Sequence, residues 1–183
     1  HLFVERHADA GLALALLRDG KVSRPGVCNA LETLLVDAPI AGTFLPQAAA
    51  LMAAHGVAAV ACARTLPLWP GAVAATESDF DREYLDLRLS VRVVDGLEGA
   101  IAHIARHGSQ HTEAIATGDA GVAARFQRAV DASAVMWNAS TRFNDGGELG
   151  LGAEIGISTT KVHAYGAMGL ESLTTRKWLV SGQ

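Results

Sequence analysis

Apolar residues in this chain show two kinds of spacing, one typical of strands and one typical of helices, which alternate along most of its length. Apolar runs of strand length lie at His1–Glu5, Thr33–Val36, Val57–Ala63, Leu87–Val94, Thr112–Ala116 and Ala132–Trp137. Helical spacing or helix-bounding residues mark the segments between them, at Ala8–Arg18, Leu45–His55, Leu97–Arg106 and Asp119–Val130. Strands and helices that alternate in this order form parallel sheets with right-handed crossovers. The pattern therefore predicts an α/β fold with a mainly parallel sheet.

Proline and glycine refine this prediction. We expect Pro46 in the first turn of the second helix and Gly56 at its end. The segment Pro67–Gly71 is predicted to be a loop. From Asn138 to Tyr165 the sequence is polar and rich in glycine, which predicts irregular structure, whereas Leu170–Val180 suits a short helix and a terminal strand.

Composition limits the function classes. The chain has 183 residues, of which 50% are hydrophobic, so it can bury the core of one domain. The net charge of −4 and the lack of a basic run argue against nucleic-acid binding. No apolar run approaches the ~18 residues of a membrane-spanning helix. Without a signal peptide, we expect a cytoplasmic protein whose two cysteines are thiols. Because the chain starts at His1 inside a strand-like run, we expect a piece of a larger enzyme.

Cys28 is the first candidate for chemistry. It follows the turn-forming pair Pro25-Gly26 and precedes a short run of helix-forming residues. Free N–H groups at a helix start favour negative charge, so we expect a lowered thiol pKa and a nucleophile. The alternative is an inert, buried thiol, which is the usual role of a free cysteine. Cys62, inside an apolar strand, fits that alternative better than Cys28 does.

The glycine-rich run from Gly146 to Gly156 has a spacing close to a dinucleotide-binding fingerprint. Its pattern Gly150-x-Gly152-x-x-x-Gly156 is one residue too long and does not open a helix after a strand. We therefore interpret the run as a tight loop that brings backbone close to a ligand or to another segment. Its backbone N–H groups are suited to an anionic substrate.

The segment Trp137–Phe143 leaves the end of a predicted strand. Ligands of open α/β sheets bind beyond the carboxyl ends of strands, so we expect this segment near a site. Arg142 could bind a carboxylate or phosphate in bidentate fashion. It could equally pair with Asp145 or Glu148, and the sequence leaves both alternatives open.

Two clusters of polar residues are weaker candidates. His103, His107 and His111 resemble a metal-binding row, but a glycine separates the third from the helix. We expect no metal site and a solvated helix face instead. The acidic run from Glu77 to Glu83 is also expected to be mostly solvated. Glu83 lies closest to the following strand and is the member that could face a cleft.

Four segments together resemble the gamma-glutamyl phosphate reductase family of the aldehyde dehydrogenase superfamily. They are Arg24–Val36 around the cysteine, Glu83–Leu87, Gly108–Ile115 with its Gly-Ser-x-His-Thr-Glu-Ala-Ile motif, and Trp137–Thr159. The resemblance covers nearly the whole chain in the same order. It implies a three-layer αβα domain with a mainly parallel sheet, the catalytic domain of this superfamily. It also implies that residues 1–183 are this catalytic domain alone, without the NADPH-binding domain, in a homo-oligomer.

The resemblance implies a reaction as well. Members of this family reduce L-glutamyl 5-phosphate with NADPH to glutamate 5-semialdehyde and phosphate, in proline biosynthesis. Cys28 matches the nucleophile that forms a thioester, and its backbone N–H is a candidate oxyanion donor. Glu83 matches a cofactor-binding glutamate, although its neighbours differ from those in the wider superfamily. Four residues match a segment near the substrate and are candidate substrate ligands: Asn138, Ser140, Thr141 and Arg142.

Two other functions remain open at this stage. Another superfamily member, hydrolytic or CoA-acylating, would share the nucleophile and the fold. A non-catalytic α/β binding module would share only the fold. The sequence gives no choice between NADPH and NADH and no indication of a fused glutamate kinase.

Overall fold

The computed structural model describes residues 1–183 and contains one seven-stranded parallel sheet in the order β4-β3-β5-β2-β1-β6-β7. Every pair of neighbouring strands in it is parallel, which confirms the predicted arrangement. The sheet therefore has an amino edge, where all strands begin, and a carboxyl edge, where they end. The strands are β1 (Leu2–Val4), β2 (Thr33–Asp37), β3 (Ala58–Ala61), β4 (Val73–Ala74), β5 (Arg88–Val94), β6 (Thr112–Ala116) and β7 (Ala134–Trp137).

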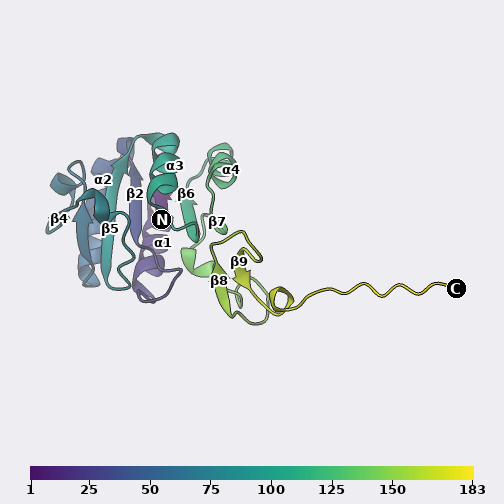
Figure 1. Ribbon diagram of the computed structural model, residues 1–183. Helices are drawn as coiled ribbons and strands as arrows, with labels where there is room; N and C mark the ends of the chain where they lie inside the picture. The colour runs from purple at the N-terminus through teal and green to yellow at the C-terminus, as the bar shows by residue number, and fades with distance from the viewer.

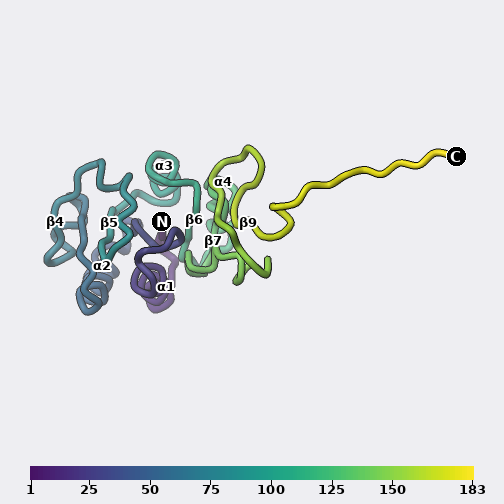
Figure 2. Tube along the Cα trace, turned by 60° about the horizontal axis from the view of Figure 1, so that its bottom comes forward, coloured from purple at the N-terminus to yellow at the C-terminus, as the bar shows by residue number.

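Four helices cover the two faces of the sheet. They are α1 (Ala10–Val22), α2 (Ala38–Ala54), α3 (Gly96–His107) and α4 (Ala120–Ala129). Figure 2 shows α1 and α2 on one face and α3 and α4 on the other, which makes the three predicted layers. Each face has its own apolar core, centred on residues such as Leu34 and Met52 on the first and Phe3 and Phe126 on the second. None of the helices combines the length and the apolar character needed to cross a bilayer.

The start of α2 differs from the prediction. The helix begins at Ala38, directly after β2, with Pro39 in its first turn. Pro46, which was expected in that position, lies inside the helix instead. A proline inside a helix removes one backbone hydrogen bond and crowds the carbonyl four residues earlier. That earlier residue is Gly42.

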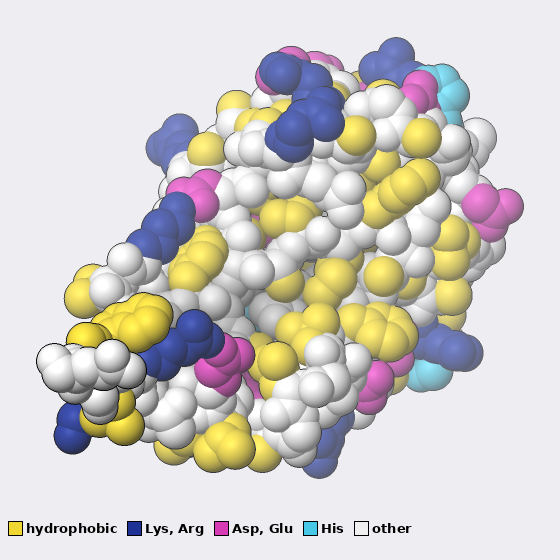
Figure 3. Space-filling view, turned by 90° about the vertical axis from the view of Figure 1, so that its right-hand side faces the viewer, with side chains coloured by type: hydrophobic (Ala, Val, Ile, Leu, Met, Phe, Trp, Pro, Cys, Tyr) yellow, Lys and Arg dark blue, Asp and Glu magenta, His cyan; other side chains and the backbone are white.

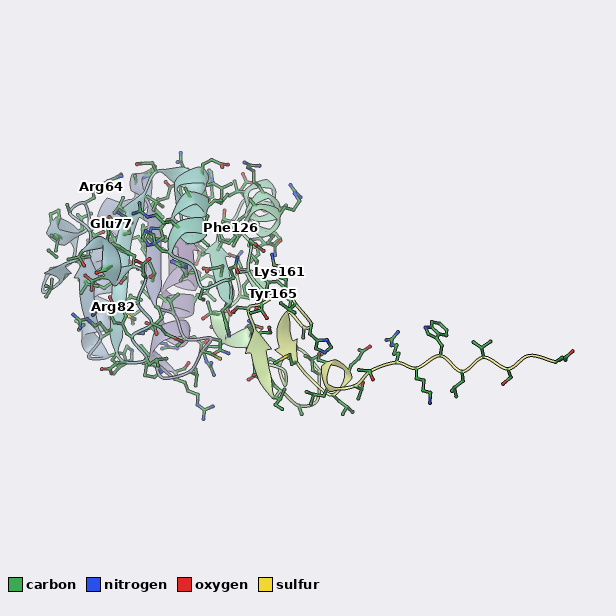
Figure 4. The ribbon with its side chains drawn as sticks, in the orientation of Figure 1. Arg64, Glu77, Arg82, Phe126, Lys161 and Tyr165 are labelled. Atoms are coloured by element: carbon green, nitrogen blue, oxygen red, sulfur yellow. The ribbon has the colours of Figure 1, made fainter.

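A hairpin in the segment expected to be irregular is the second difference. It consists of β8 (Gly156–Ser158) and β9 (Gly166–Met168), which pair antiparallel outside the main sheet (Figure 1). Lys161 joins it to the sheet domain, because its Nζ lies 2.6 Å from Asp131 Oδ1. The same ammonium group lies 5.2 Å from the centre of the Tyr165 ring (Figure 4). The sequence did not indicate this hairpin because its strands are short and contain glycine.

The C-terminal segment contains the predicted short helix but not the predicted terminal strand. Four single-turn 3-10 helices occur, at Leu66–Leu68 (η1), Glu77–Asp79 (η2), Thr141–Phe143 (η3) and Glu171–Leu173 (η4). After η4 the chain runs outward without pairing (Figure 1), because no strand of the chain lies beside it. Trp178 is 91% exposed there. Figure 3 shows the molecule from the side of this C-terminal segment, where hydrophobic side chains lie on the surface.

Candidate functional site

The cavity that holds Cys28 opens at the amino edge of the sheet and has a volume of about 310 Å³. Segments that precede β1, β2, β5 and β6 meet here, since parallel neighbours begin at one edge. Most of its lining residues are polar or charged. They are His1, Cys28, Ala30, Glu32, Thr33, Phe80, Asp81, Arg82, Glu83, His107, Ser109, His111, Thr112, Glu113 and Thr159.

This cavity is not at the carboxyl edge, where the sequence led us to expect a site. Side chains of the chain itself occupy that edge. Asp37, at the end of β2, is buried and accepts hydrogen bonds from Arg6 Nε at 2.7 Å and Gly96 N at 3.0 Å. A wider hollow of about 700 Å³ lies near Cys62, and four of its charged residues form two ion pairs, Arg64 with Asp95 and Arg92 with Glu77. In Figure 4, Arg64 and Arg82 lie toward opposite edges of the sheet.

The loop that carries Cys28 contains turns and no helix. The predicted short helix after Cys28 is therefore wrong. Asn29, which is buried, donates from its side-chain amide to the carbonyl oxygen of Asn144 at 3.0 Å and to that of Arg142 at 3.3 Å. The N–H of Leu31 donates to the carbonyl of Gly20 at 2.9 Å. These contacts hold the loop in an irregular path and leave the Cys28 side chain exposed.

The electrostatic surroundings of Cys28 also differ from the prediction. Partial removal of the sulfur from water raises the pKa of the thiol, and the nearby carboxylates of Glu154 and Glu83 raise it further. Backbone hydrogen bonds at Cys28 and Asn29 lower the pKa but do not outweigh these effects. The expected lowering of the pKa is wrong because no helix begins here. Within this chain, the sulfur therefore carries less negative charge at neutral pH than a free cysteine.

A buried ion pair closes the Cys28 loop at its base. Lys21, the buried end of α1, places its Nζ 2.9 Å from Glu32 Oε2. The other oxygen of Glu32 accepts a hydrogen bond from Leu85 N at 3.2 Å. Burial lowers the pKa of Lys21 and raises that of Glu32. The pair thus connects the Cys28 loop to the segment that follows Glu83.

Glu83 lines the cavity and makes no hydrogen bond or ion pair within the chain. Its position is fixed by its neighbours, because Tyr84 Oη lies 2.9 Å from Ser90 Oγ and Leu85 has a left-handed backbone with a φ of 54°. The other acidic residues of the run are engaged. Glu77 pairs with Arg92, Asp79 accepts hydrogen bonds from Thr76, and Asp81 Oδ1 lies 2.6 Å from His107 Nδ1.

The three histidines do not form the solvated face that the sequence predicted. His103 is 6% exposed and His111 is 9% exposed, and His107 contacts Asp81. Burial, followed by the charges of His107 and Arg92, lowers the pKa of His103 to about 3. The chain contains no group of three or more His, Cys, Asp or Glu side chains placed to hold a metal ion.

Comparisons with known proteins decide the family. The chain is 60% identical over 183 residues to gamma-glutamyl phosphate reductase from Thermus thermophilus, of which it covers 44%. It is equally identical to the enzyme of that name from Salinibacter ruber, covering 42%. A crystal structure of gamma-glutamyl phosphate reductase from Thermotoga maritima matches the whole chain with a TM-score of 0.96 at 45% identity, over 44% of that structure. In sequence and fold, the chain belongs to the gamma-glutamyl phosphate reductase family.

The chain spans less than half the length of these gamma-glutamyl phosphate reductases. No protein-family model matches the sequence. A more distant structure, an acetylating aldehyde dehydrogenase from Geobacillus thermoglucosidasius, has a TM-score of 0.60 at 19% identity and covers 80% of this chain and 41% of that one. At this identity the match shows the fold alone, which is of the aldehyde dehydrogenase type.

The four predicted substrate residues of this family member lie outside the Cys28 cavity. Asn138, at the carboxyl edge, holds Thr117 through both ends of its side-chain amide, at 3.0 Å to the N–H and 2.9 Å to the carbonyl. Ser140 accepts from the N–H of Arg142 at 3.2 Å, and Thr141 packs against Gly20. These contacts favour structural roles for Asn138, Ser140 and Thr141. The substrate-binding assignment stays a prediction.

Arg142 and the glycine-rich loop lie together beside a separate surface hollow. Arg142 lines this hollow with Asp145 and Glu148 but pairs with neither. The loop's amides serve internal carboxylates: Gly146 N donates to Glu154 Oε2 at 2.7 Å, and Gly147 N donates to Asp145 Oδ1 at 2.9 Å. These hydrogen bonds stabilise the turn of the loop itself, so the two N–H groups are not free to bind an anionic ligand.

Sequence reasoning did not place two titratable residues of this cavity, Glu113 and His111, near Cys28. Glu113 is a buried carboxylate 2.8 Å from His1 Nδ1, and burial raises its pKa. His111 is a buried imidazole whose Nε2 has no partner. Both belong to the Ser-x-His-Thr-Glu motif at the start of β6, so the motif was visible. Its proximity to Cys28 was not, because the motif lies at the start of β6 whereas Cys28 lies in the loop before β2.

Proposed function

We propose that the complete protein reduces L-glutamyl 5-phosphate to glutamate 5-semialdehyde and phosphate, with NADPH, as a step of proline biosynthesis. The observation that carries the proposal is the exposed Cys28 thiol at a polar cavity, in a chain with the sequence and fold of the gamma-glutamyl phosphate reductases. The relatives' name supports the acyl phosphate as substrate. A solved relative with the same fold, an engineered glycolyl-CoA reductase, contains NADP+, which supports a nicotinamide cofactor.

Cys28 is the proposed nucleophile. The thiol proton first passes to water; the thiolate sulfur then forms a bond to the acyl carbon, and the carbonyl electron pair moves onto oxygen. When the carbonyl re-forms, the bond from carbon to the phosphate oxygen breaks and phosphate leaves with the electron pair, giving a thioester. A bound NADPH would supply the hydride that takes this thioester to the aldehyde level. The sulfur then leaves as thiolate, so Cys28 returns to its starting state.

A residue of the Cys28 cavity, Glu83, is suited to the nicotinamide end of NADPH. Glu83 presents a carboxylate without a partner at the Cys28 cavity, and carboxylates bind ribose hydroxyls. Glu83 would thus hold the nicotinamide ribose. We also propose that the rest of the nucleotide binds to a domain outside residues 1–183, since these residues span less than half of the relatives.

The exposed apolar side chains of the hairpin and the C-terminal segment support a further proposal, a homo-oligomer in which these side chains are covered (Figure 3). Trp178, Leu179 and Val180 are all more than four-fifths exposed in the single chain. Contiguous exposed apolar surface of this kind commonly marks an interface.

The test uses the complete polypeptide in the oxidative direction. Purified protein is given glutamate semialdehyde, NADP+ and phosphate, and NADPH formation is followed by absorbance. We expect phosphate-dependent activity that Cys28→Ser abolishes. The matched control is Cys62→Ser, which changes the other cysteine and should keep the activity. Activity in Cys28→Ser would refute the mechanism.

The same assay separates the alternatives. The acyl acceptor is replaced in turn by water and by coenzyme A. Turnover that needs coenzyme A, or that proceeds equally well without any added acceptor, would indicate another type of aldehyde dehydrogenase. No turnover with any acceptor, in protein that is folded, would indicate a binding module.

A further inference from the structure

His111 is held at the start of β6 by a hydrogen-bond network that reaches the Cys28 loop. The ring Nδ1 lies 2.6 Å from Thr112 Oγ1, and the Asn144 side-chain amide lies 2.8 Å from the same oxygen. That amide also donates to the His111 carbonyl at 3.3 Å. The Asn144 carbonyl accepts from Asn29, the residue after Cys28. Buried side chains thus fix the imidazole relative to the nucleophile loop.

The network determines which ring nitrogen carries the proton. The nitrogen of the Asn144 amide faces the His111 carbonyl, which can only accept, so the same nitrogen donates to Thr112 Oγ1. The hydroxyl proton of Thr112 then has one remaining neighbour, the Nδ1 of His111. If Nδ1 accepts this proton, the neutral ring carries its own hydrogen on Nε2. The other tautomer, with the hydrogen on Nδ1, would leave the Thr112 hydroxyl proton without an acceptor in addition to the unpartnered Nε2. Its cost in free energy is therefore greater.

The Nε2 atom is then a buried donor without an acceptor in the chain. A native structure rarely leaves such a group unsatisfied unless a ligand or water completes it. His111 lines the same cavity as Cys28. Glu83 lines it as well.

We propose that His111 is a catalytic residue whose neutral Nε2–H donates a hydrogen bond to an oxygen of the acyl phosphate substrate at Cys28. The proposal rests on the proposed function. A donor fixed in advance and aimed at developing negative charge stabilises the transition state without reorganisation. Asn29, Thr112 and Asn144 are positioning residues, since they act on the substrate only through the loop and the ring.

The charge state of the ring is consistent with this role. Burial lowers the pKa of His111. Glu83, Glu154 and Glu113 oppose the lowering but do not reverse it. The imidazole therefore stays neutral at neutral pH, and it donates a hydrogen bond without transferring a proton.

The first test compares two variants in the phosphate-dependent assay of the complete polypeptide. His111→Gln keeps an N–H donor near the place of Nε2, whereas His111→Leu has similar bulk and no donor. Loss of a single preorganised donor lowers kcat by ~100-fold or more. We expect such a loss in His111→Leu and at most about a tenfold loss in His111→Gln. A fall in kcat at constant KM for phosphate would assign the acyl oxygen as acceptor, and a raised KM would assign the phosphate group.

Equal activity in His111→Leu and the unmutated protein would overturn the proposal, as would equal losses in the two variants. If the unmutated protein shows no phosphate-dependent activity, the proposed function fails instead. A second measurement does not depend on activity or on variant folding. Nitrogen NMR of the unmutated protein at neutral pH should show His111 protonated at Nε2 and unprotonated at Nδ1. Protonation at Nδ1 would overturn the proposal.

Discussion

Replacement of Lys21 by Met should test how strongly the base of the Cys28 loop is held. The Lys21 ammonium group is fully buried and lies 2.9 Å from Glu32, whose side chain is 18% exposed. At an effective dielectric constant of about 20, this separation corresponds to an attraction of about 6 kcal/mol. Removal of both charges from water costs several kcal/mol per ion, so the net contribution of the pair is small. Removal of one partner leaves Glu32 uncompensated.

We therefore expect Lys21→Met to lower the free energy of unfolding by about 3 kcal/mol, the lower end of the usual range because Glu32 keeps some contact with water. The double variant Lys21→Met/Glu32→Gln removes the uncompensated charge and keeps an acceptor for Leu85 N. It should recover about 2 kcal/mol. Urea denaturation with linear extrapolation measures all three proteins.

The matched control is Arg176→Met, which breaks an exposed ion pair with Glu171. It should cost less than about 0.5 kcal/mol. The reasoning would be refuted if Lys21→Met cost no more than this control, or if the double variant were no more stable than the single one. The first result would mean that the buried charge is solvated in solution, and the second that lost packing rather than charge causes the effect.

Three further predictions follow from single residues. His103 is neutral when folded, with a pKa of about 3, so the unfolded chain takes up a proton below its ordinary pKa of about 6.5. The free energy of unfolding should therefore fall by about 2 kcal/mol between pH 6.5 and 5. His103→Gln should make the free energy of unfolding, measured by urea denaturation, less dependent on pH in this range. An unchanged pH dependence would contradict the buried, neutral ring. Iodoacetamide should label Cys28 more slowly than free cysteine at pH 8, and Glu154→Gln should accelerate labelling, as measured by peptide mapping; no acceleration would exclude this carboxylate as a cause of the raised pKa. Gly42→Ala, with open space in α2, should raise the free energy of unfolding by about 0.5–1 kcal/mol. Gly108→Ala should lower it by ~1–3 kcal/mol, because its Cβ would lie 2.5 Å from a backbone oxygen, and equal effects of the two alanines would refute the steric argument.

The alternation of apolar runs and helical segments was sufficient to predict the parallel sheet, because strands such as β2 and β6, which are buried along their whole length, are mainly apolar. Turn residues were less informative. Pro46 suits a first turn in isolation, but the chain that leaves β2 at Asp37 is already placed to begin a helix, and Pro39 serves that start. Local preference therefore located the helices but misplaced the end of α1 and the start of α2.

The sequence by itself determined the class of fold, the family resemblance and the identity of Cys28 as the candidate nucleophile. The tertiary structure alone decided what surrounds that sulfur. Strand order places β1 beside both β2 and β6, which brings the loop before Thr33 and the motif before Glu113 to one edge although they are far apart in the chain. Partial burial of the sulfur, together with the charges of Glu154 and Glu83, and not the expected helix start, then sets the direction of the thiol pKa. Such effects depend on distances through space, which no local pattern of residues records.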